Sequence, residues 1–160
     1  MPLCDPKGLI GALRAKGLRM SAAESCTGGL IGYAITSEPG SSEVFMGSAV
    51  TYSNESKERL LGVPHDILEM YGAVSEETAR SMAMGSIAAY GSDVSVAVTG
   101  IVGPGGATET KPVGLVFIAV SDGSRCIVSK FIFDGDRQSV RQQTADEAIR
   151  MLEDMLEGKL

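Results

Sequence analysis

Two nucleophilic side chains, Ser25 and Cys26, are adjacent where the sequence changes from a strand pattern to a helix pattern. Thr27, Gly28 and Gly29 follow, and such a turn brings backbone N–H groups and the positive end of a helix dipole to one place. It suits either an oxyanion hole or a phosphate cradle, so Ser25 is a candidate nucleophile. The run equally fits a plain helix start in which Ser25 or Thr27 is only the N-cap.

A serine nucleophile needs a base, and a Ser-His-Asp triad would depend on the single histidine, His65. Lys57 is the alternative, because burial that lowers a lysine pKa by about 3 units lets the amine take a serine proton near neutral pH. Tyr52 ends a predicted strand just before the helix of Lys57, so its hydroxyl could relay or orient that proton. A solvent-exposed helix lysine is the other interpretation of Lys57.

A third candidate site combines the glycine-rich residues 100–108 with Arg137. Loop N–H groups can form an anion-binding nest, and a guanidinium can hold a phosphate through two hydrogen bonds. No Gly-Lys-Ser/Thr follows and no Gly-x-Gly-x-x-Gly opens a helix, so neither common nucleotide-binding loop is present. A tight loop beside a surface arginine fits the same residues.

The cysteines do not indicate a metal or disulfide framework. Cys4, Cys26 and Cys126 are odd in number, far apart and without C-x-x-C spacing, and one histidine excludes a multi-histidine site. A thiol is the better intrinsic nucleophile, but no histidine is obviously placed to form the Cys26 thiolate. We therefore expect Cys26 to be a small buried side chain and expect no metal site.

Composition narrows the class of protein. The 160 residues carry a net charge of −6, with a pI near 4.8 and no Lys/Arg run, so a nucleic-acid partner is not expected. No window approaches the ~20 apolar residues of a membrane span, and the amino terminus lacks the order of a signal peptide. We expect one cytoplasmic domain, residues 1–160, with a complete core and no membrane partner.

The candidate residues must be positioned by the predicted helices and strands. Strands and helices alternate in the first part of the chain, and the last two strands form a hairpin. Helices are predicted at 6–16, from 30, at 64–70, at 75–90 and at 137–156, with a further short one that carries Lys57, is capped by Asn54 and ends at Gly62. Strands are predicted at 18–23, 47–52, 94–98, 113–120 and 126–133. This order favours a three-layer α/β/α sandwich with a mixed sheet of about five strands, whose strand order stays open.

Six ordered segments resemble the CinA C-terminal domain family and span nearly the whole chain. They are residues 23–29 (AESCTGG), 52–57 (YSNESK), 72–79 (GAVSEETA), 99–106 (TGIVGPGG), 111–114 (KPVG) and 133–137 (FDGDR). That family includes nicotinamide mononucleotide deamidases, which hydrolyse the nucleotide's carboxamide to nicotinate mononucleotide and ammonia without a metal. The resemblance also implies an α/β/α sandwich, a small nucleotide substrate and no cofactor.

Carried over residue by residue, the resemblance implies Ser25 as nucleophile with Tyr52 and Lys57 as its activating partners. N–H groups near Cys26 to Gly28 would hold the oxyanion. The remaining substrate-site candidates that the resemblance implies are Thr27, Gly29, Thr99, Gly103, Gly105, Gly106 and Arg137.

Two departures from the family pattern leave alternatives open. Val102 stands where relatives usually have alanine, which adds bulk beside the expected site. Many relatives also carry a second domain ahead of this one, for which we expect no room in 160 residues. The alternatives are a non-catalytic nucleotide- or partner-binding module and an amidase for another phosphorylated amide. Whether the chain forms a homo-oligomer also stays open.

Overall fold

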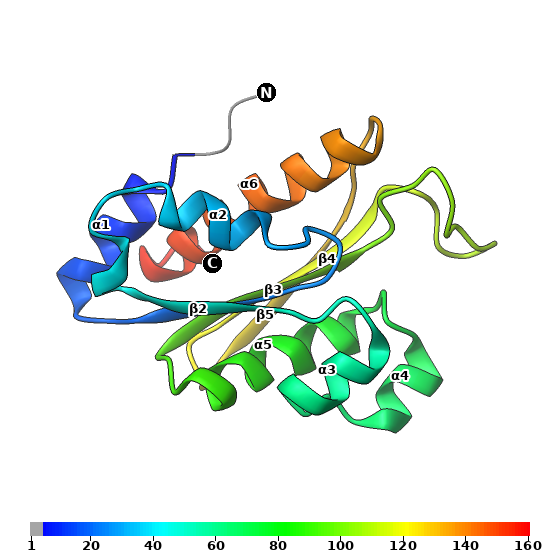
Figure 1. Cartoon of the computed structure of the whole chain (residues 1–160), viewed down its shortest axis with the longest axis horizontal. Coiled ribbons are helices and arrows are strands. Elements are labelled where there is room, and N and C mark those ends of the chain that lie inside the picture. The colour runs from blue at the N-terminus through cyan, green and yellow to red at the C-terminus, as the bar shows by residue number, and fades with distance from the viewer. Residues whose placement is uncertain (1–4) are drawn as a thin grey trace.

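The computed structural model describes residues 5–160 and shows a three-layer α/β/α sandwich around one five-stranded mixed sheet (Figure 1). Its strand order is β2-β1-β3-β4-β5; β1 runs parallel to β2 and β3, whereas β4 is antiparallel to β3 and β5. The strands are β1 (Met20–Glu24), β2 (Phe45–Val50), β3 (Val94–Gly100), β4 (Leu115–Ser121) and β5 (Cys126–Ile132). The predicted fold class is confirmed. Cys4 lies outside the described residues.

Helices cover both faces of the sheet (Figure 1). One layer holds α1 (Lys7–Lys16), α2 (Leu30–Thr36) and α6 (Arg137–Leu156); the other holds α3 (Asn54–Leu61), α4 (His65–Tyr71) and α5 (Glu76–Tyr90). A short 3-10 helix, Ser41–Glu43, precedes β2. No helix within residues 5–160 is long and apolar enough to cross a bilayer.

The boundaries of these elements follow local chemistry, with one correction to the predicted caps. Ser53 caps α3, because its hydroxyl accepts from Ser56 N at 3.1 Å, whereas Asn54 is the first helical residue. Gly62 ends that helix in the left-handed conformation, which glycine adopts without a Cβ clash. Ser75 and Asp136 cap α5 and α6 in the same way as Ser53.

Two apolar clusters lie on opposite faces of the sheet. The larger packs α1, α2 and α6 against the strands, and the smaller packs α3, α4 and α5. Val102 belongs to the larger cluster and is only 6% exposed. The bulk that it adds relative to alanine is therefore packed in the core.

The sheet brings candidate functional residues together at the carboxyl ends of its three parallel strands. In the parallel strands, Glu24 is in register with Val50 and with Val98, so the next residues of the three strands are neighbours at the carboxyl end. These next residues are Ser25, Thr51 and Thr99. In open α/β sheets this end of the strands is where ligands usually bind.

Candidate active site

Ser25 and Lys57 form a direct contact at this end of the sheet. Lys57 Nζ donates a hydrogen bond to Ser25 Oγ at 3.1 Å, although 32 positions separate the residues in sequence. Lys57 is fully buried at 0% exposure and Ser25 is 9% exposed. The structure thus places the serine and the lysine singled out from the sequence as a pair, and Lys57 does not lie on a solvated helix face.

The surroundings of Lys57 lower its pKa towards neutral pH. Burial lowers the pKa of Lys57 from 10.5 to about 8, and no carboxylate within residues 5–160 forms an ion pair with it. Its Nζ also donates to the carbonyls of Thr51 at 2.7 Å and Tyr52 at 3.3 Å. In the protonated amine the third N–H donates to Ser25 Oγ; once that proton is lost, the two carbonyls retain the other two N–H groups and the lone pair faces Ser25 Oγ, whose proton it can take. Lys57 therefore has both the pKa and the orientation of a general base.

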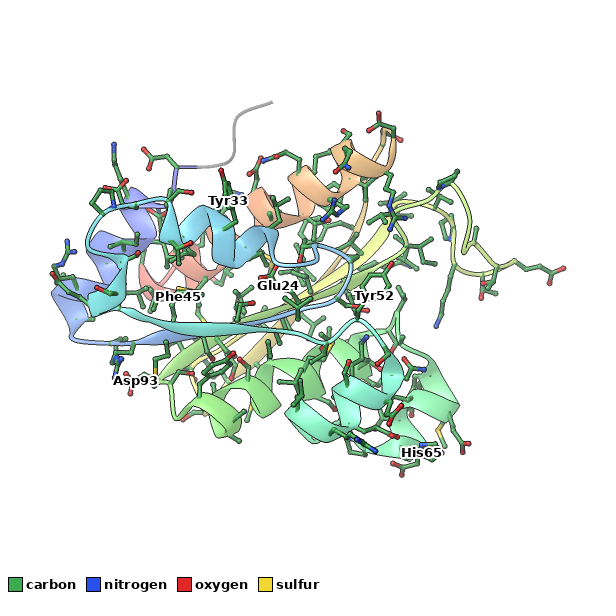
Figure 2. All side chains as sticks on the ribbon, in the orientation of Figure 1. Glu24, Tyr33, Phe45, Tyr52, His65 and Asp93 are labelled. Carbon is green, nitrogen blue, oxygen red and sulfur yellow. The ribbon has the colours of Figure 1, made fainter. Side chains whose placement is uncertain are left out.

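A buried carboxylate, Glu24, organises the start of α2. Its Oε1 accepts from Thr27 Oγ1 at 2.6 Å and from the backbone N–H groups of Gly29 at 3.2 Å and Ile31 at 2.9 Å. Its Oε2 accepts from Gly32 N at 3.0 Å and Ser48 Oγ at 2.6 Å. Figure 2 shows Glu24 on the α2 side of the sheet.

This arrangement argues against a phosphate cradle, one of the two alternatives that the sequence left open at this turn. The N–H groups at the start of α2 are already used by Glu24, so they do not form a free anion site. The buried hydroxyl of Thr27 likewise donates to Glu24 and is neither an N-cap nor a free substrate contact.

The turn after Ser25 contains the backbone N–H groups that were expected to hold an oxyanion. Gly28 N–H donates to Ser25 O at 3.1 Å, which removes it from the expected oxyanion donors. No oxygen atom of the described chain accepts from the N–H groups of Cys26 or Thr27. The Cys26 side chain is 5% exposed, and burial raises the pKa of its thiol to about 12. Cys26 therefore fits the expected small buried thiol. Its backbone N–H, rather than its sulfur, is the candidate for a role in the site.

Tyr52 is placed differently from the expectation. Its side chain is 65% exposed, and its hydroxyl accepts from Arg137 Nη2 at 3.4 Å. Among the described residues its phenol forms no hydrogen bond with Ser25 or Lys57; its backbone carbonyl contacts Lys57 instead. The structure thus gives Tyr52 a contact with Lys57 through its main chain and leaves its side chain at the surface.

Arg137 joins Tyr52 to the glycine-rich loop, because its Nη1 donates to Gly103 O at 2.8 Å. The neighbouring Gly105 and Gly106 are exposed, so this loop and the guanidinium form one polar rim near Tyr52. The predicted combination of loop and arginine is brought together.

Thr99 was a candidate for a direct substrate contact, but its side chain is buried and has another partner. It is 1% exposed, and its hydroxyl donates to Ala73 O at 2.7 Å. Its side chain therefore anchors the segment before α5 to the end of β3. The Thr51 hydroxyl, by contrast, is a buried side-chain oxygen with no hydrogen-bond partner among residues 5–160, in the residue whose carbonyl holds Lys57.

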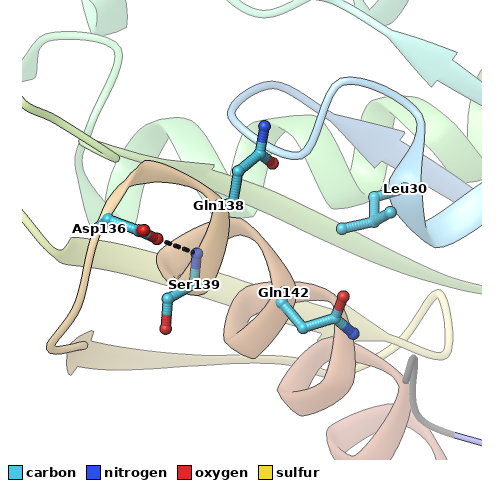
Figure 3. A pocket seen from close by; sticks show the side chains of 5 residues that line it. All are labelled: Leu30, Asp136, Gln138, Ser139 and Gln142. Carbon is cyan, nitrogen blue, oxygen red and sulfur yellow. Dashed lines mark hydrogen bonds between the residues drawn. The ribbon is translucent and has the colours of Figure 1, made fainter. Parts of the chain in front are cut away.

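A hollow of about 300 Å³ lies between the starts of α2 and α6 (Figure 3). Leu30, Asp136, Gln138, Ser139 and Gln142 line it, and Asp136 accepts a hydrogen bond from Ser139 N at 2.9 Å. In the described part of the chain, no group of three or more His, Cys, Asp or Glu side chains could hold a metal ion.

Two residues of this site were missed from the sequence. Glu24 precedes the candidate nucleophile, but its capping of α2 depends on which face of β1 it occupies. Arg141 donates to the carbonyls of Cys26 at 3.2 Å and Thr27 at 2.9 Å. Its spacing of four from Arg137 places both arginines on one helix face, a signal that could have found it.

Comparisons with known proteins show which family the chain resembles over its length. The family model described as "CinA C-terminal domain" matches residues 6–156. A "Putative competence-damage inducible protein" of Caldicellulosiruptor bescii is 49% identical over 144 residues, which cover 90% of this chain and 35% of that protein. A "CinA-like protein" of Geobacter sp. is also 49% identical over 144 residues, again 90% of this chain and 35% of that protein. The chain thus spans about a third of the length of these curated relatives.

Solved structures show the same fold. A competence/damage inducible protein from Agrobacterium tumefaciens has a TM-score of 0.92 at 39% identity, with 98% of this chain and 99% of that chain covered. A competence damage-inducible protein from Klebsiella pneumoniae has a TM-score of 0.92 at 31% identity, with 95% and 94% covered.

Proposed function

Because the chain belongs to the CinA C-terminal domain family, we propose that it is an amidohydrolase that cleaves the carboxamide of nicotinamide mononucleotide. The observation that carries the proposal is the buried contact of Lys57 Nζ with Ser25 Oγ at 3.1 Å. A serine beside a lysine of lowered pKa is a known arrangement for acyl transfer. The products are nicotinate mononucleotide and ammonia.

The chemistry follows from the positions of three groups. Ser25 Oγ bonds to the carboxamide carbon while neutral Lys57 takes the serine proton. The N–H groups of Cys26 and Thr27 hold the developing oxyanion. The C–N bond then breaks, Lys57 returns its proton to the leaving nitrogen, and ammonia departs. A water molecule next attacks the acyl group with Lys57 again as base, which releases the carboxylate and restores Ser25.

The phosphate of the substrate is assigned to the polar rim near Tyr52. Arg137 still has N–H donors beyond those used for Gly103 and Tyr52, and the exposed glycine loop adds backbone donors. Binding the phosphate there would hold the reacting amide over Ser25, so that binding energy is used for orientation.

The test of this function is ammonia release from nicotinamide mononucleotide in the presence of EDTA. We expect release with equal formation of nicotinate mononucleotide, and expect it to persist in Cys26→Ala because the Cys26 backbone is retained. Saturable binding without release would support the non-catalytic binding module, and preferred release from another phosphorylated amide would change the substrate. Loss of release on EDTA treatment would contradict the metal-independent mechanism.

The dependence of the reaction on pH follows from Lys57. Since the base must be neutral, kcat/KM should rise with pH and level off above the pKa of about 8. Below that value the rate should fall about tenfold per pH unit, because the fraction of neutral amine falls by that factor. Initial rates from pH 6 to pH 10 measure this. A profile that is flat across pH 8 would contradict Lys57 as the base.

Removal of the Tyr52 hydroxyl should have a modest effect. In Tyr52→Phe only the contact with Arg137 is lost, while the backbone carbonyl that holds Lys57 remains. We expect a KM increase of up to about tenfold, the scale of one hydrogen bond, with little change in kcat. Steady-state kinetics measure both constants. A fall in kcat of a hundredfold or more would show that the phenol itself moves the proton.

A further inference from the structure

Arg141 holds the turn that follows Ser25 by two consecutive carbonyl groups. Its Nε donates to Cys26 O at 3.2 Å and its Nη2 donates to Thr27 O at 2.9 Å. Its third nitrogen, Nη1, donates to Gln138 Oε1 at 2.9 Å, which fixes the guanidinium on α6. One planar, charged group therefore sets the orientation of two successive peptide units.

The direction of these peptides determines where their N–H groups point. In a trans peptide the carbonyl of one residue and the N–H of the next are antiparallel. Because Arg141 binds Cys26 O, the Thr27 N–H points away from Arg141, and no oxygen of residues 5–160 accepts from it. A hydrogen bond from a cation to the carbonyl also polarises the amide, which makes that N–H a stronger donor.

Gly28 leaves room for Arg141 to reach the carbonyls of the turn. It has φ +61°, and a Cβ built on it would lie 3.1 Å from Arg141 Nη2. A side chain at this position would both be strained and press on the guanidinium. The glycine after Thr27 therefore serves the approach of Arg141 as well as the turn itself.

The charges around the turn give Arg141 a second effect. Glu24 places a buried carboxylate directly before Ser25, and a negative charge there opposes the negative charge that develops on the substrate oxygen. Arg141 brings a positive charge to the other side of the same turn. Its removal would leave the turn with the Glu24 charge uncompensated on that side.

We propose that Arg141 is a positioning residue that aligns and polarises the Thr27 N–H as an oxyanion donor. The proposal rests on the proposed serine chemistry, but not on the identity of the amide substrate. It predicts that loss of Arg141 weakens stabilisation of a tetrahedral, negatively charged state more than it weakens binding of a planar ligand.

The experiment measures phosphonylation of Ser25 by an alkyl fluorophosphonate. Ser25 Oγ forms a bond to phosphorus, fluoride leaves, and Lys57 takes the serine proton, while the phosphonyl oxygen occupies the oxyanion position. The variants are Arg141→Gln and Arg141→Lys, with Ser25→Ala to verify the labelled residue. Arg80→Gln is the matched control, because Arg80 also donates to a backbone carbonyl, Cys126 O at 2.7 Å.

We expect the second-order labelling rate to fall about tenfold to a hundredfold in Arg141→Gln, somewhat below the loss of a whole oxyanion donor. Arg141→Lys, which keeps the charge but not the two-pronged geometry, should recover only part of the rate. Arg80→Gln should label like the wild type. The Kd for nicotinate mononucleotide, the product whose carboxylate is planar, should change less than about threefold in Arg141→Gln. The kcat of this variant for the amide substrate should fall with KM nearly unchanged.

Other results overturn the proposal. Labelling of Arg141→Gln within about twofold of the wild-type rate would show that the turn holds its donors without Arg141. A fall in labelling that is matched by loss of product binding and by a Tm decrease absent from Arg80→Gln would mean a structural role only. Wild-type protein that labels at Ser25 but releases no ammonia from the nucleotide would reject the proposed substrate and leave the labelling comparison to decide on Arg141. Absence of labelling at Ser25 in the wild type would overturn both.

Discussion

Replacement of Ser25 by alanine is expected to lower ammonia release from nicotinamide mononucleotide at least about a thousandfold, because the variant has no oxygen to form the acyl-enzyme. Substrate binding should persist, since the Arg137 rim and the backbone donors of Cys26 and Thr27 remain. The measurement is kcat by ammonia release together with Kd for the product. The change should therefore appear almost entirely in kcat.

The fold of this variant should be unaffected. Ser25 Oγ accepts one hydrogen bond, from Lys57 Nζ, and Lys57 keeps the carbonyls of Thr51 and Tyr52 as partners. The matched control is Ser124→Ala in the exposed β4–β5 loop, which should keep wild-type kcat. Turnover of Ser25→Ala within about tenfold of the wild type would reject Ser25 as nucleophile, and would point to water activated directly by Lys57.

The sequence is informative about the site where chemistry depends on local order. A strand that ends in a turn of small residues and continues as a helix places Ser25 at the carboxyl end of that strand, and this local pattern does not depend on the rest of the chain. The same holds for Lys57, since Ser53 and Gly62 fix the ends of its helix, and helix periodicity turns Lys57 and Leu61 towards the sheet together. The predicted α/β/α class follows from similar local patterns.

The errors concern partners that are distant in sequence. Arg141 lies 114 positions after Thr27, so its hydrogen bond depends on how α6 packs beside α2. Tyr52 was expected to act through its hydroxyl, but the chain turns out of β2 so that its carbonyl faces Lys57 and its ring faces solvent. Glu24 takes the helix N–H groups that one of the two alternatives, the phosphate cradle, would have needed. In each case local pattern gives the residue type, and tertiary packing decides which atom is free.

Replacement of Lys57 by methionine is expected to lower kcat about a hundredfold to ten-thousandfold, the usual contribution of a general base. Most core substitutions lower the free energy of unfolding, but this one should not. Lys57 is buried at 0% exposure with no carboxylate partner in the described chain, so its charged form is unfavourable there. Methionine has similar length and no charge, which removes this unfavourable contribution. The substitution also has a cost, because it leaves two carbonyls without a donor. At pH 7 we therefore expect the free energy of unfolding to be unchanged or raised.

The pH dependence of stability separates these contributions. The pKa of Lys57 is about 8 in the folded chain and 10.5 when unfolded, so between these values the unfolded state binds more protons. Stability of the wild type must then rise with pH over this window, relative to a variant that lacks the group. From pH 7 to pH 10 the wild type should gain about 2–3 kcal/mol of unfolding free energy over Lys57→Met, from 1.36 kcal/mol per pKa unit.

Urea denaturation of both proteins at pH 7 and pH 10 measures this difference, and common titrations elsewhere in the chain cancel in the comparison. Lys130→Met, which removes an exposed lysine of β5, is the matched control and should show no such gain. If the wild type gains nothing over Lys57→Met between these pH values, Lys57 has an ordinary pKa and stays protonated well above pH 8. The lysine would then serve only as a hydrogen-bond donor to Ser25, and the base would have to be another group. If the gain appears together with loss of kcat, one desolvated amine accounts for both the stability cost and the reactivity of Ser25, because the same burial that disfavours its charge makes it a base near neutral pH.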